Sequence, residues 1–115
     1  MLGLGTSIPT SRSVSTTVIP LLDEFSTDSH SGWSVRKLTE SYSGPCMKVR
    51  EASGNTEQDI YFDSNGLLDV SALESHCNGA DGFVSVWYDQ TDNTSGLDLV
   101  QTNTANQPQI ASSGS

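Results

Sequence analysis

The segment Gly82–Tyr88 has the most regular hydrophobic pattern in the chain, because apolar residues occupy most of its positions. In an extended segment, successive side chains point to opposite faces. The two predicted faces carry Phe83, Ser85 and Trp87 on one side and Val84, Val86 and Tyr88 on the other. Both faces are largely apolar, which is typical of a strand covered on both sides. The pattern therefore predicts a central strand.

A β-hairpin is predicted upstream of this strand. Cys46–Arg50 alternates imperfectly between apolar and polar residues, and Gln58–Phe62 is a second strand candidate. Between them, Ser53–Thr56 has the composition of a turn. Short β segments are also expected near residues 97–100 and 108–110.

Two short helices are predicted on either side of the hairpin. Trp33, Leu38 and Tyr42 have offsets that suit one apolar helix face, ending at Gly44-Pro45. The second helix is predicted over Asp69–His76.

The second helix follows a tight turn at Asn65-Gly66, a dipeptide that favours such turns. Its N-terminal cap is either Ser71, which has capping-box spacing with Glu74, or Asp69.

Residues 1–20 are predicted to be an extended docking arm. Their apolar residues lie among Gly, Ser, Thr and Pro with no helical period, so the segment cannot bury them by itself. We expect it to contact other chains through Leu2, Leu4, Ile8, Pro9, Val18 and Ile19. Residues 21–115 would then form one β-rich module, because the length suits a single domain.

The chain of 115 residues is strongly acidic, with 5 Lys and Arg against 14 Asp and Glu and a net charge of −9. Phosphate and anionic membrane surfaces are bound through clustered cations, so the balance argues against nucleic acid and membrane partners. Most of the cations lie close together and are expected to pair with nearby acids: Arg36, Lys37, Lys48 and Arg50. No segment approaches the ~20 apolar residues of a membrane span.

No cofactor or metal is expected. Cys46 and Cys77 do not have the spacing of metal ligands. The two cysteines form either a disulfide or two buried free thiols, and free thiols are the favoured alternative. The acidic loop with Asp89, Asp92, Asn93 and Asp98 could offer oxygen ligands to calcium, but it lacks EF-hand spacing and reads better as a polar turn.

No enzymatic activity is expected either. A glycosidase needs two carboxylates flanking the scissile bond. Asp59 and Asp89 are the candidates, but a carboxylate beside Trp87-Tyr88 more often caps a turn. Trp87 and Tyr88 are candidate carbohydrate contacts, with packing in the core as the favoured alternative.

Three motifs follow one another along the chain: Tyr42-Ser-Gly-Pro45, Val49-Arg50 and Tyr88-Asp-Gln90. Through these motifs, residues 21–110 resemble the opening segment of family 54 α-L-arabinofuranosidase catalytic domains. Cys77 stands where that family has a half-cystine, but its partner position is Gly82 here, so the disulfide would be missing. The resemblance implies a concanavalin A-like or jelly-roll β-sandwich, of which this chain would be the start. The family's catalytic carboxylates match no residue here.

The same segment resembles bacteriophage structural and tail-fibre modules still more. These share further motifs, among them Gln58-Asp-Ile60, Gly82-Phe-Val84, Trp87-Tyr-Asp-Gln90 and Gln107-Pro-Gln-Ile110. This resemblance implies a virion protein assembled in the host cytoplasm, most often a trimer. It would be the N-terminal part of a tail fibre, or of a baseplate- or capsid-attached fibre, with virion proteins and a host glycan as partners. The alternative is a non-catalytic carbohydrate-binding module or a fragment of a glycoside hydrolase.

Overall fold

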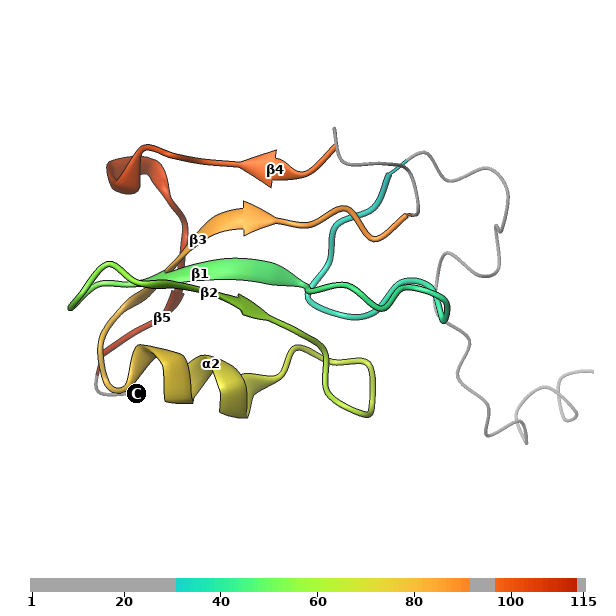
Figure 1. The fold of residues 1–115 in the computed structure, drawn as a ribbon, viewed down its shortest axis with the longest axis horizontal. Helices are drawn as coiled ribbons and strands as arrows, with labels where there is room; N and C mark the ends of the chain where they lie inside the picture. The colour runs from blue at the N-terminus through green and yellow to red at the C-terminus, as the bar shows by residue number, and fades with distance from the viewer. Residues whose placement is uncertain (1–30, 92–96, 114–115) are drawn as a thin grey trace, which may run out of the picture.

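The computed structural model describes residues 31–91 and 97–113, and the predicted docking arm lies outside these residues. The described chain forms an antiparallel five-stranded sheet with one short α-helix (Figure 1). In chain order the elements are β1 (Met47–Glu51), β2 (Glu57–Ile60), α2 (Val70–Cys77), β3 (Gly82–Trp87), β4 (Leu99–Val100), the 3-10 helix η2 (Thr104–Asn106) and β5 (Gln109–Ala111). The mainly β prediction is therefore confirmed.

The sheet order is β2-β1-β3-β4, and β5 also pairs with β3. β1 and β2 form the predicted hairpin, and β3 is central as predicted. A second sheet, which a sandwich requires, is not among the residues that the structure describes. None of the helices in these residues has the length and apolar character of a membrane span.

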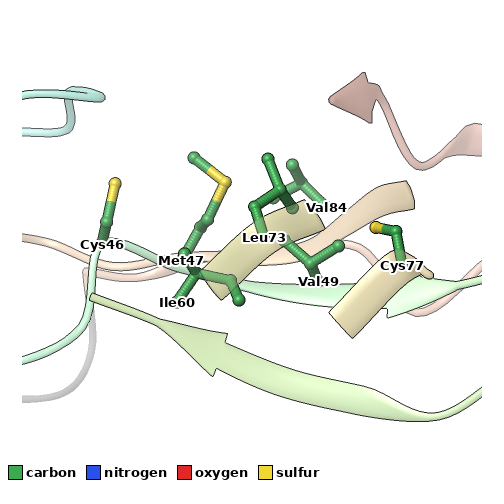
Figure 2. Close-up of a cluster of buried hydrophobic side chains, with 7 residues drawn as sticks. All are labelled: Cys46, Met47, Val49, Ile60, Leu73, Cys77 and Val84. Atoms are coloured by element: carbon green, nitrogen blue, oxygen red, sulfur yellow. The ribbon is translucent and has the colours of Figure 1, made fainter. Parts of the chain in front are cut away.

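The core lies between α2 and one face of the sheet (Figure 2). Its buried members come from β1, β2, β3, α2 and the residue before β1: Cys46, Met47, Val49, Ile60, Leu73, Cys77 and Val84. Both cysteines are free thiols. Asp69, rather than Ser71, caps α2, because its side chain accepts the Ala72 N–H at 3.0 Å.

The helix predicted over Trp33–Tyr42 is wrong. An isolated β-bridge joins Arg36 to Leu67, and the Lys37 N–H donates to the Gly66 carbonyl at 2.7 Å. A helix would use these backbone groups within the segment itself. The turn around Gly66, which has a φ of 74°, provides long-range partners that hold the segment extended.

The predicted alternation along β3 is also wrong beyond Ser85. Lys48 pairs with Val86 and Val49 with Val84, so Ser85 is an extra residue in a β-bulge. The bulge moves Trp87 to the face of Met47, where it packs against the core, and moves Val86 to the opposite face.

Gly82 and Cys77 are tightly packed against each other. A Cβ at position 82 would lie 2.6 Å from Cys77 Sγ and 3.2 Å from Val49 Cγ1. Both neighbours belong to the buried core, so neither can move freely. The Cys77 thiol thus fills the space that a side chain at position 82 would need.

Gly82→Ala is therefore expected to destabilise the fold by about 1–3 kcal/mol through overpacking. In a Cys77→Ala background the same substitution should cost much less, because the sulfur is gone. Urea unfolding of the four variants of this double-mutant cycle measures the coupling. An equal cost in both backgrounds would contradict the contact.

The loop between β1 and β2 is organised by one buried carboxylate. Glu51 is 6% exposed, and its two oxygens accept hydrogen bonds from Ser53, Gly54 and Thr56. The Ser53 and Thr56 hydroxyls, followed by the backbone N–H groups, hold the pKa of Glu51 well below its usual range.

Because the folded-state pKa lies below the unfolded one, Glu51 should stabilise the fold fully above its unfolded pKa and lose this effect as pH falls through the folded pKa. Glu51→Gln should thus destabilise at neutral pH, and the difference from wild type should shrink in acid. Urea unfolding across pH tests this, with exposed Glu57→Gln as the control. A difference that does not vary with pH would argue against it.

Candidate functional site

Gln90 brings the end of β3 together with the segment 34–38. Its side chain is completely buried. Gln90 Oε1 accepts the Leu38 N–H at 2.8 Å, and Nε2 donates to the carbonyls of Ser34 and Arg36, both at 3.0 Å. Trp87 Nε1 donates to the same Ser34 carbonyl at 3.3 Å. Gln90, the last residue of the Trp-Tyr-Asp-Gln motif, therefore holds residues 34–38 against the end of β3, and we call this set of hydrogen bonds the clamp.

The Tyr-Ser-Gly-Pro motif closes on itself. Tyr42 Oη donates to the Pro45 carbonyl at 2.8 Å, and a Cβ at Gly44 would lie 2.6 Å from that hydroxyl. Burial, with Asp98 as the next contribution, raises the pKa of Tyr42 to about 12. The phenol thus stays protonated at neutral pH and remains a donor.

Asp89 is a buried residue that stabilises a turn. It is 6% exposed, and its carboxylate accepts hydrogen bonds from the Gly32 N–H at 2.8 Å and from the Thr91 N–H at 3.0 Å. The Thr91 hydroxyl contacts both carboxylate oxygens, at 2.9 and 3.0 Å. Asp89 therefore caps a turn, as the favoured sequence interpretation expected.

Only part of the possible calcium site lies among the described residues. Asp98 Oδ1 accepts the Asp89 N–H at 2.9 Å, while Asp92 and Asn93 lie outside the described residues. Within residues 31–91 and 97–113, no cluster of three or more His, Cys, Asp or Glu could hold a metal ion.

Asp59 and Tyr88 form a hydrogen-bonded acid–aromatic pair. Tyr88 Oη donates to Asp59 Oδ1 at 2.7 Å, and both residues are half-buried. Asp59 pairs with Lys48, and Lys48 pairs with Val86, so these side chains share the sheet face opposite α2, which we call the open face. Burial, followed by the Asp59 hydrogen bond, raises the pKa of Tyr88 well above its ordinary range.

Arg50 also belongs to the open face but is 9% exposed. Nε donates to Gln107 Oε1 at 2.8 Å, Nη1 donates to Asn55 Oδ1 at 2.7 Å, and the guanidinium lies 4.9 Å from the Phe83 ring centre. The partners of Arg50 among the described residues are therefore two amides and a ring, and the expected pairing of the cations with acids stays a prediction. Arg50 fastens the segment before β5, a long-range role that no local pattern indicated.

The two candidate sugar contacts lie on different faces of the sheet. Trp87 packs against the core, as the core-packing alternative expects, whereas Tyr88 reaches Asp59 on the open face. The bulge at Ser85 lies just before them, so the face that each residue occupies is the reverse of the predicted one, and their contact with a sugar stays a prediction.

Comparison with known proteins agrees with the motifs. The family described as "Alpha-L-arabinofuranosidase B, catalytic" matches residues 26–114, and the chain belongs to this family. An α-L-arabinofuranosidase B from Emericella nidulans is 36% identical over 67 residues, which are 57% of this chain and 13% of the relative. The chain thus spans a small part of that relative's length. No solved structure matches.

Neither match names a virus particle protein. The carbohydrate alternative therefore has more support than the phage interpretation, which stays a prediction. The docking residues of the arm lie outside the described residues.

Gln90→Leu should destabilise the fold by about 3 kcal/mol or more, because several buried backbone groups would lose their partner. It should also change the fluorescence of Trp87, whose indole N–H shares the Ser34 carbonyl. Urea unfolding followed by fluorescence measures both effects. The same substitution at exposed Gln58 is the control, and equal small effects at the two positions would contradict the clamp.

Proposed function

We propose that this chain is a non-catalytic part of an arabinofuranosidase B-type domain, which contributes a rigid sheet and a sugar-contacting open face. The ligand class is a glycan that carries α-L-arabinofuranosyl residues, as the relative's name suggests. The observation that carries the proposal is the half-buried Asp59–Tyr88 pair on the open face.

Two buried acids of the described chain are unsuited to catalysis. Glu51 and Asp89 are almost fully buried, and their oxygens already accept hydrogen bonds from neighbouring backbone and hydroxyl groups. A glycosidase instead needs two carboxylates facing a substrate, with one able to donate a proton. In this proposal any catalytic pair belongs to other parts of an arabinofuranosidase domain.

Asp59 differs from both of these acids. Its Oδ1 accepts the Tyr88 hydroxyl, and Oδ2 has no hydrogen-bond partner among the described residues. A carboxylate oxygen is a strong acceptor for sugar hydroxyls, and an adjoining tyrosine offers an apolar ring with a polar tip. The pair therefore offers the two kinds of contact that a sugar ring requires.

The fold fits the same proposal. The sheet has one face packed under α2, while the side chains of the open face are mostly half-buried, and a sandwich places a second layer or a ligand against such a face. We extend the proposal to a concanavalin A-like architecture, in which the described sheet is one layer. The described residues do not test the expected virion partners, the trimer or the virion localisation.

The test is calorimetric titration with arabinan, alongside an assay for release of an aryl α-L-arabinofuranoside. Binding without turnover is expected, and Asp59→Asn and Tyr88→Phe should each weaken binding by roughly tenfold, the loss of about one charge-assisted hydrogen bond. Glu74→Gln, on the exposed side of α2, should bind normally.

Turnover that Asp59→Asn or Asp89→Asn abolishes would make the chain an enzyme and overturn the non-catalytic proposal. Absence of arabinan binding would overturn the sugar-contact part.

A further inference from the structure

The two outer edges of the described sheet differ in charge. β2 carries Glu57 and Asp59, and charged edge residues are a common protection against association. At the opposite edge, β4 consists of Leu99 and Val100, which are 50% and 61% exposed. Leu97 beside them is 40% exposed.

One charged residue, Asp98, adjoins β4, and a hydrogen bond holds its carboxylate. Asp98 precedes the strand, and its Oδ1 accepts the Asp89 N–H. No Lys, Arg or Pro lies between residues 97 and 107, so β4 lacks the residues that usually block edge pairing.

Each face of β4 carries one exposed apolar side chain. Leu99 pairs with Trp87 and so lies on the α2 side, whereas Val100 pairs with Val86 and lies on the open side. α2 packs against β1, β2 and β5, and β4 is at the edge of the sheet farthest from it (Figure 1). A layer on one face could bury only one of the two side chains. A strand in the plane of the sheet presents side chains to both faces and can bury both.

We propose that this strand is β4 of a second copy of the chain, paired antiparallel around a two-fold axis. An edge strand can pair with its own copy in this way, and the contact closes at two subunits. Pairing β4 with β2 of another copy would desolvate Glu57 and Asp59 against apolar side chains, which is unfavourable. β4 itself carries no charged residue, so the two strands that would pair across the axis bring no charge of their own into contact, although each copy carries a net charge of −9.

Sedimentation equilibrium over a roughly hundredfold range of protein concentration tests this pair. A monomer–dimer equilibrium is expected, and added salt should tighten it by screening the like-charged copies. Amide hydrogen exchange at residues 97–101 should slow as the dimer forms, which distinguishes this edge from any other contact surface.

Val100→Lys should leave a folded monomer, because lysine on an edge strand blocks pairing and the side chain is mostly exposed in the single chain. Circular dichroism and thermal unfolding check that fold. The matched control is Gln58→Lys on the β2 edge, which should still dimerise. A monomer at every concentration, a trimer, or a dimer that survives Val100→Lys with unchanged exchange at β4 would overturn the proposal.

Discussion

The completely buried side-chain amide of Gln90 bonds to three backbone groups of the segment from Ser34 to Leu38. This contact joins chain positions more than fifty residues apart. It holds the segment extended over the end of β3, where it also receives the indole N–H of Trp87 and the thiol of Cys46. A buried amide with all of its groups satisfied specifies one geometry, because each lost partner leaves a desolvated polar group. The motif end of the sheet depends on this geometry.

The bulge at Ser85 determines which side chains lie on each face of the sheet. Without it, Trp87 would share the face of Phe83, and regular pairing would place Val86 over the core. With it, Trp87 becomes a core side chain. Tyr88 is left as the aromatic residue of this motif on the open face, beside Asp59. One extra residue thus separates the core side chain Trp87 from the Asp59–Tyr88 pair of the proposed sugar contact, and bulges are common near functional sites.

Local signals predicted the elements whose partners lie nearby in the chain. The β1–β2 hairpin, the turn before α2 and the helix itself all follow from turn residues, spacing and a cap at Asp69. The non-helical course of residues 33–42 and the bulge could not be predicted in this way. Their geometry depends on Gln90, Gly66 and the pairing of β1 with β3, which are contacts between distant residues.

The candidate site shows the same division. Turn-capping by Asp89 was accessible from its position after an aromatic pair, because short acids commonly satisfy such turns. The role of Arg50 could not be predicted from the sequence, since its neighbours in sequence include several acids while its partners in space are two amides and a ring.

Composition gives the net charge of the whole chain, but the positions of the acids in the fold determine what each charge does. Glu51 and Asp89 are buried in turns where their oxygens accept hydrogen bonds, whereas Asp59 lies on the open face. β2 carries two acids, and β4 itself carries no charged residue. A strongly acidic chain can therefore still offer one edge strand without charged residues for the proposed pairing with its own copy.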